Sequence, residues 1–285
     1  MSNEIVNQKP KFSVAIQTDA YKKLINQTLG DPDRAKRFVA SISSAVATNS
    51  ALQECDAGTI LTGALLGEAL NLSPSPVLGQ FYLIPFKNKT KGISEAQFVL
   101  GAKGYVQMAI RSGQYKDIDY IEIREGEYKG RNKQTGKQEF EFIEDEEERL
   151  SKPVVGYMAY FELLNGFYKS IYWSKEKMEK HADQYSKAFS LADYKKLQMN
   201  QIPEKDLWKY SSYWYKDFDG MAFKTLLRQL ISKFGVMSID MTTAFEKDMS
   251  VMQTNGDFDY VDNPNEEPTI IPAKEDKKVT KLDEI

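Results

Sequence analysis

One segment combines a strand pattern, two glycines and a lysine at the expected start of a helix. In residues 97–111, Gly101-Ala102-Lys103-Gly104 marks the change from strand to helix. Free backbone N–H groups at a helix start, the positive end of the helix dipole and a lysine ammonium together attract phosphate. The segment is not a Walker A loop, because Tyr105 stands where that motif has its magnesium-binding hydroxyl. Glycines also precede helices for purely steric reasons, so both interpretations stay open.

A second pair of cations, Lys224 and Arg228, is spaced four residues apart in another expected helix. This spacing places both on one edge of the helix, so that their stems can lie on the core while the charges reach outward. We expect the Lys224/Arg228 edge and Lys103 to form two walls of one groove. Such pairs also occur on helices merely for solubility.

Cations and aromatic rings are mixed between residues 85 and 116, where six lysines and arginines face one acid. Rings beside positive charge suit a single nucleic-acid strand, because stacking contributes about 1–3 kcal/mol per base without sequence preference. The competing interpretation is that most of the rings fill the core. Besides Lys103, the candidate contacts for DNA in this stretch are Phe86, Lys87, Tyr105, Gln107 and Arg111.

Further cations lie in an expected hairpin between residues 128 and 138, which contains four of them and no acid. Arg131 and Lys133 are our candidates for DNA contacts at its tip. A block of five acidic residues follows at 144–148 and lowers the local charge.

Catalytic interpretations are weaker. Asp117, Asp119 and Glu122 could hold magnesium in a nuclease, but on a strand the first two point one way and the third the other. Cys55 and His181 are the sole cysteine and histidine, so one chain cannot build a zinc site from these residues. We expect His181 to be a packed helix residue. The sequence therefore predicts a binding protein rather than an enzyme.

Charge is distributed unevenly along the 285 residues. The net charge is -3, of which residues 249–285 contribute -5, so the remainder is slightly basic. We expect a polar N-terminal arm at 1–32, a core at 33–248, and an acidic, disordered tail at 249–285. With no long apolar run and no leader-like start, the chain is expected in the cytoplasm, away from the membrane.

The pattern of apolar residues predicts helices followed by strands and then helices again. This order indicates an α+β fold with a mainly antiparallel sheet. Residues 190–210 are expected to be irregular, and Asp56 is the expected N-cap of the second helix. The expected helices span 34–52, 57–72, 103–111, a segment after Ser174, and 218–234. The expected strands span 79–86, 96–100, 117–125, 138–143, 154–164 and 167–173.

Several short motifs, in order, resemble the RecT family of phage and prophage recombination proteins over residues 34–248. The glycine-tyrosine-lysine-glycine usual in that family is Gly101-Ala102-Lys103-Gly104 here, and residues 125–150 match poorly. The matching motifs are CDAGTIL at 55–61, NLSP at 71–74, LGQFYLIPF at 78–86, AQFVLGAKGY at 96–105, RSG at 111–113, GYMAY at 156–160 and DGMAFKT at 219–225.

The resemblance implies a protein that binds single-stranded DNA, anneals it to a complementary strand without ATP, and oligomerises as a ring or helical filament. It also implies similarity of fold to the lambda Red beta annealing protein, a 5′–3′ exonuclease partner and a host single-strand-binding protein. No cofactor is expected to be required, and magnesium would serve as a counterion of DNA. Two alternatives remain: a passive coat on single strands and a magnesium-dependent nuclease.

Overall fold

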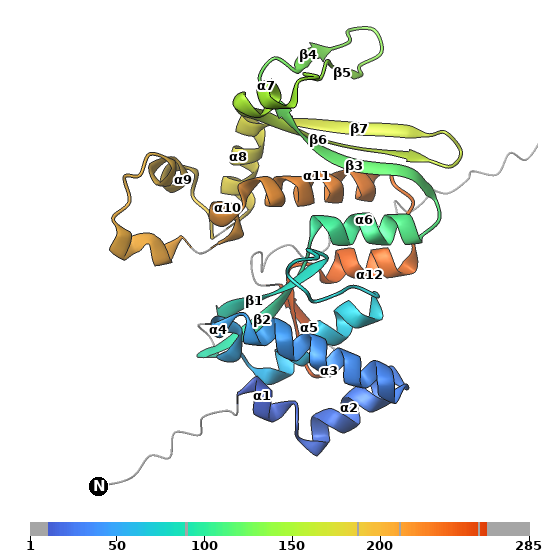
Figure 1. The fold of residues 1–285 in the computed structure, drawn as a ribbon, viewed down its shortest axis with the longest axis vertical. Helices are drawn as coiled ribbons and strands as arrows, with labels where there is room; N and C mark the ends of the chain where they lie inside the picture. Colours follow the sequence, from blue (N-terminus) through green and yellow to red (C-terminus); the bar gives the residue numbers. More distant parts are fainter. Residues whose placement is uncertain (1–10, 89–90, 187, 211, 256, 261–285) are drawn as a thin grey trace, which may run out of the picture.

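The predicted α+β class is confirmed by a computed structural model, which describes residues 11–88, 91–186, 188–210, 212–255 and 257–260. Each pair of neighbouring strands in the described sheets runs antiparallel. The described residues form three sheets, with the strand orders β1-β2-β8-β9, β3-β6-β7 and β4-β5. Helices separate the two larger sheets, as Figure 1 shows.

The N-terminal part is helical and packs into the core, which corrects the expected polar arm at 1–32. Phe12, Ile16 and Ile25 are each 1% exposed and pack into the core, although Val14 and Leu24 of the same stretch are exposed. Residues 1–10 of the expected arm lie outside the described residues. The first five helices are α1 (Phe12–Ala15), α2 (Asp19–Leu29), α3 (Pro32–Ala47), α4 (Ser50–Gln53) and α5 (Ala57–Ala69).

Helix α5 begins where the sequence indicates, because the Asp56 side chain accepts hydrogen bonds from the backbone N–H groups of Gly58 and Thr59. The expected helix at 34–52 is divided into α3 and α4, with Asn49 capping the second.

The larger sheet combines an N-terminal hairpin with strands from the C-terminal region. Val251 is fully buried, so the boundary expected at 249 is wrong and the core extends past it. Residues 261–285, the greater part of the expected tail, lie outside the described residues. The strands of this sheet are β1 (Phe81–Asn88), β2 (Ile93–Leu100), β8 (Ser250–Met252) and β9 (Phe258–Tyr260).

The three-stranded sheet lies against the long helix α11, with α6 and α12 between that helix and the first sheet (Figure 1). Leu226, Leu227, Leu230 and Ile231 of α11 are fully buried, as the apolar stripe predicts. The elements are β3 (Tyr115–Arg124), β6 (Val154–Leu163), β7 (Tyr168–Ser174), α6 (Ala102–Arg111), α11 (Phe218–Phe234) and α12 (Ile239–Lys247).

Two smaller regions project from this body. The region at 190–210 is not irregular, because Ser190 caps a helix and the buried Tyr194 anchors it. The hairpin between 128 and 138 is present, although its second strand is shorter than the expected 138–143. The elements are β4 (Tyr128–Arg131), β5 (Gln138–Phe140), α7 (Glu146–Ser151), α8 (Lys175–Tyr185), α9 (Leu191–Gln198), the 3-10 helix η1 (Glu204–Lys209) and α10 (Tyr213–Lys216).

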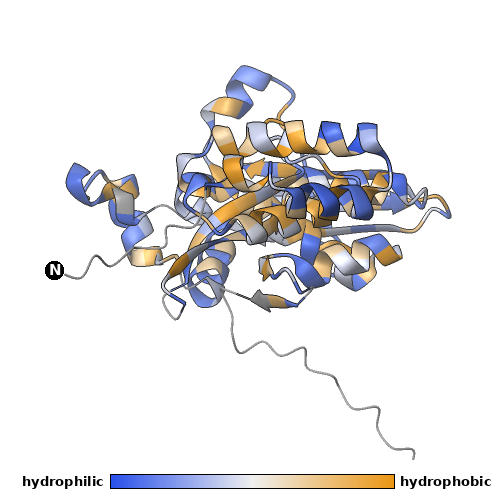
Figure 2. Cartoon of the chain, turned by 90° about the horizontal axis from the view of Figure 1, so that it is seen from below, coloured by the Kyte–Doolittle hydropathy of each residue, from blue (hydrophilic) through white to orange (hydrophobic). Residues whose placement is uncertain are grey.

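Apolar residues gather between the layers. Figure 2 shows apolar strands in the interior and helices whose outer sides are hydrophilic. The core is continuous from the N-terminal helices to α11 and α12, because Phe38, Phe98 and Leu226 all belong to one cluster of buried residues.

Four elements meet at one buried carboxylate, that of Asp248, directly after α12. Its side chain is fully buried and accepts hydrogen bonds from the Leu100 backbone N–H at 2.8 Å and the Tyr105 hydroxyl at 2.8 Å. It also forms ion pairs with Lys224 Nζ and Arg228 Nη1, both at 2.9 Å. The carboxylate therefore connects β2, α6 and α11 to the segment after α12.

Asp248 is charged in this site. Burial opposes the charged form, but the cations of Lys224 and Arg228 and the donated hydrogen bonds hold the pKa of Asp248 below its ordinary value. Burial and the neighbouring Asp248 raise the pKa of Tyr105 well above its ordinary value, so its hydroxyl keeps the proton that it donates.

Replacing Asp248 with alanine is expected to lower the free energy of unfolding by about 3–5 kcal/mol, because two cations lose their buried partner. Urea denaturation at neutral pH measures the change. The matched control is Asp33→Ala, which removes an exposed carboxylate paired with Lys36 and should cost less than about 1 kcal/mol. Equal losses in the two variants would contradict the structural role of Asp248.

Candidate nucleic-acid interface

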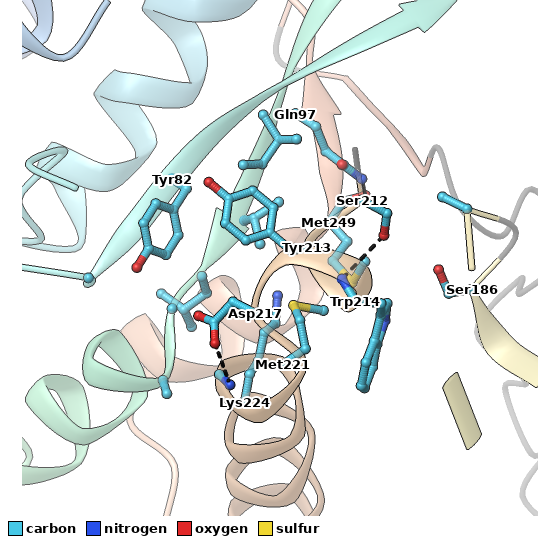
Figure 3. A pocket seen from close by; sticks show the side chains of 18 of the residues that line it. Tyr82, Gln97, Ser186, Ser212, Tyr213, Trp214, Asp217, Met221, Lys224 and Met249 are labelled. Carbon is cyan, nitrogen blue, oxygen red and sulfur yellow. Dashed lines mark hydrogen bonds between the residues drawn. The ribbon is translucent and has the colours of Figure 1, made fainter. Parts of the chain in front are cut away.

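A cavity of about 500 Å³, called here the main cavity, opens between the two larger sheets. Strand β1 and the start of α6 form one side, and α10 with the first turns of α11 forms the other. Figure 3 shows Tyr82 on the first side and Tyr213, Asp217 and Met221 on the second. The main cavity therefore lies between segments that are distant in sequence.

Aromatic rings line both sides of the main cavity. The Tyr82 and Tyr213 ring centroids are 5.8 Å apart, and Tyr120 packs against Phe223 at 4.7 Å. Burial raises the pKa of Tyr82 and of Tyr213, with Asp217 adding to the effect at Tyr213. Both hydroxyls are therefore neutral at pH 7 and can donate hydrogen bonds without repelling an anion.

Lysines accompany these rings. Lys87, at the end of β1, and Lys103, in the first turn of α6, are exposed and line the main cavity together with the partly buried Phe86. Asp217 contributes an acidic side chain to the lining. Its carboxylate also caps α11 by accepting a hydrogen bond from the Gly220 backbone N–H at 3.0 Å. The structure thus brings together Phe86, Lys87 and Lys103, as expected from the sequence.

A second cavity, of about 340 Å³, adjoins the first. Val77, Lys103 and Tyr120 line both cavities, and the exposed Gln107 of α6 lines the second. The two cavities together form one groove along the start of α6, which we call the α6 groove. Gln107 therefore lies on the same groove as Lys103.

The glycines before α6 have a steric role, which favours the simpler of the two interpretations of this segment. A Cβ on Gly101 would lie 2.1 Å from the Gly79 carbonyl oxygen, and one on Gly104 would lie 2.1 Å from the Gln80 carbonyl oxygen. Only glycine permits this approach of α6 to the chain before β1. The result is that the Lys103 side chain is placed directly at the groove.

Lys224 lines the main cavity together with Lys103, as expected, whereas Arg228 lies elsewhere. The Lys224 side chain is 6% exposed, and it lies at the lining of the main cavity with its ammonium on Asp248. Arg228 is bound to the same carboxylate and is not among the described residues that line either cavity. Both charges are engaged in the junction, and their contact with phosphate stays a prediction.

Tyr105 and Arg111 also have structural roles. Tyr105 is fully buried, so the predicted DNA contact by this ring is wrong. The Arg111 guanidinium donates to the Leu70 and Asn71 carbonyl oxygens, both at 2.7 Å, at the end of α5. Carbonyl groups at a helix end need such donors, and Arg111 supplies them instead of facing the groove.

Arg131 and Lys133 lie on a different part of the molecule. The β4-β5 hairpin projects at the far end of the three-stranded sheet, away from β1 and the start of α6 (Figure 1). The Arg131 side chain donates to the Gly136 carbonyl oxygen at 2.8 Å, and Lys133 is exposed. Their contact with DNA stays a prediction, separate from the α6 groove.

Sequence reasoning missed the tyrosines of the groove. Tyr82 alternates with buried neighbours on β1, so a period of two indicates its outward direction, but nothing local indicates what it faces. Tyr213 belongs to the four-residue helix α10, which lies in a region expected to be irregular or unassigned.

Catalytic chemistry finds little support in the described residues. They contain no group of three histidine, cysteine or acidic side chains placed to hold a metal. Burial raises the pKa of the Cys55 thiol to about 12, so it stays protonated. His181 packs between Trp173 and Tyr185, as expected, and burial lowers its pKa.

Membrane insertion of a helix is a separate question. Among the residues that the structure describes, no helix combines the length and apolar character that a crossing requires.

Comparisons with known proteins identify the family. The model of the RecT family matches residues 36–262. The chain is 38% identical over 222 residues to an uncharacterized protein, YqaK, of Bacillus subtilis. The matched residues make up 78% of this chain and 66% of that relative. The chain is 30% identical over 95 residues to protein RecT of Escherichia coli, covering 33% of this chain and 35% of that protein. The chain thus spans less than two thirds of either relative, and the match over most of its own length shows that it belongs to the RecT family.

Proposed function

We propose that the protein binds single-stranded DNA in the α6 groove and anneals it to a complementary strand without ATP. The observation that carries the proposal is the joint presence of Lys87 and Lys103 with Tyr82 and Tyr213 along one groove. Membership of the RecT family supports it.

The chemistry of the lining favours a single strand. Exposed lysines neutralise backbone phosphates, while neutral rings stack on bases of any sequence. A duplex has its bases stacked internally, so partly buried rings such as Tyr82 would find no free face. Binding through the backbone leaves base edges available for pairing.

Annealing needs no nucleotide under this proposal. Two strands repel each other through their phosphates, and a basic groove reduces that repulsion while base pairing supplies the free energy. Lys103 and Lys87 have the role of phosphate contacts, Gln107 that of a hydrogen-bonding neighbour, and Phe86, Tyr82 and Tyr213 that of stacking surfaces. Arg131 and Lys133 are proposed to contact DNA outside the α6 groove.

The proposal extends to assembly and partners. The protein acts as a homo-oligomer in the cytoplasm, in phage homologous recombination, with a 5′–3′ exonuclease that exposes the single strand and a host single-strand-binding protein. No cofactor is required, and magnesium acts as a counterion of the DNA.

Lys103→Ala is expected to weaken binding of a mixed-sequence oligonucleotide about tenfold at low salt, since it removes a charge-assisted phosphate contact. The slope of log affinity against log salt should become shallower by about 0.7. Lys36→Ala, at an exposed position of α3, is the matched control and should leave the slope unchanged. An unaltered slope in Lys103→Ala removes this lysine from the interface.

Tyr213→Ala should lower the affinity for an oligonucleotide about 5- to 150-fold, which corresponds to the loss of one stacked base at about 1–3 kcal/mol. Tyr213→Phe keeps the ring and should retain most of the affinity. Fluorescence anisotropy measures both. Tyr185→Ala, a change at a 50% exposed tyrosine of α8, serves as control. Similar losses for Tyr213→Phe and Tyr213→Ala would contradict stacking.

The function itself is tested by mixing complementary oligonucleotides that carry a donor and an acceptor fluorophore. The protein should accelerate their pairing without nucleotide, and Lys103→Ala should reduce the acceleration. An unchanged or slowed rate despite binding would identify a passive coat. Shortening of the labelled strands after magnesium is added would instead identify a nuclease.

A further inference from the structure

Two exposed apolar side chains stand beside the α6 groove. Val77 is 86% exposed and Leu78 is 47% exposed, on the loop between α5 and β1. Isolated apolar residues are common on protein surfaces and need no function. Val77 differs by its position, because it lines both the main cavity and the second cavity.

The loop that carries Val77 is held in place. The Ser73 backbone N–H donates to Gln80 Oε1 at 2.7 Å, and the Leu78 N–H donates to the Ser75 carbonyl oxygen at 3.0 Å. Pro76, directly before Val77, has a φ restricted by its ring. The exposed side chain is therefore presented by a supported turn.

Val77 stands where the two cavities meet. Lys103 and Tyr120 line both cavities as well, so all three residues lie at their boundary. A strand that occupies both cavities must cross this boundary with its phosphate near Lys103. Its bases then meet Val77, an apolar side chain with no hydrogen-bonding group.

We propose that Val77 is a wedge that separates two neighbouring bases of the bound single strand. Apolar side chains that enter a base step unstack it, and the extra contact with the protein offsets the lost stacking. The proposal rests on the proposed function, since it requires a strand in the α6 groove. As a consequence, the bound strand consists of short runs of stacked bases. One unstacked step per bound subunit separates each run from the next.

The test uses oligonucleotides in which 2-aminopurine occupies successive positions, because its fluorescence rises when it unstacks. With the full-length protein, the rise on binding should be large at some positions and small at others. Val77→Ser should reduce the largest rise by about half or more, because it replaces two methyl groups with one polar hydroxyl that fills less of a base step. Val77→Leu should preserve it. Ile239→Ala, a change at an 85% exposed apolar residue of α12, is the matched control and should have no effect.

Two results would overturn the wedge. The first is a fluorescence pattern in Val77→Ser that equals that of the unaltered protein. The second is a loss of oligonucleotide affinity in Val77→Ser as large as in Lys103→Ala, because Val77 would then be a general contact. Failure of the proposed function is distinguishable, because the unaltered protein would then not bind the oligonucleotide. Thermal melting of each variant verifies that this exposed substitution leaves the fold intact.

Discussion

The buried carboxylate of Asp248 is the constraint on which the arrangement depends. A charge that is buried away from solvent must be stabilised by other polar groups. Asp248 is stabilised by a hydroxyl, a backbone N–H and two cations, all of which come from other elements. Each of these partners has a definite position only if β2, α6 and α11 are docked. Helices α6 and α11 also contribute to the walls of the α6 groove, so its shape depends on this junction.

The junction also decides which cations face solvent at the groove. Lys224 and Arg228 are used to neutralise Asp248, and Arg111 is used at the end of α5. Lys87, Lys103 and Lys209 remain exposed along the lining of the main cavity. The positive surface is therefore smaller than the number of nearby lysines and arginines indicates, and aromatic rings form much of the remaining wall.

Much of the fold was predictable because its signals are local. The N-cap at Asp56 and the apolar stripe of α11 both follow from short-range periodicity and capping, and the structure confirms them. Helix α1 was missed because it is four residues long, and α2 was missed because it is polar and buries Ile25 alone among its residues. Their helical form depends on packing against distant segments.

The candidate site was predictable only in part. Phe86, Lys87, Lys103 and Gln107 were expected and do line the α6 groove. Tyr105 was expected there too, but its place at the second turn of α6 turns it inward toward Asp248. The direction of a side chain on a known helix depends on what the helix packs against, and that information is not local.

Cross-linking tests the location of the strand most directly. An oligonucleotide carrying 5-iodouracil is bound to the protein, irradiated and mapped by mass spectrometry of peptides. The account predicts cross-links to Tyr82 and Tyr213, on opposite sides of the main cavity. Cross-links confined to the β4-β5 hairpin, with none in the peptides that contain these tyrosines, would contradict it.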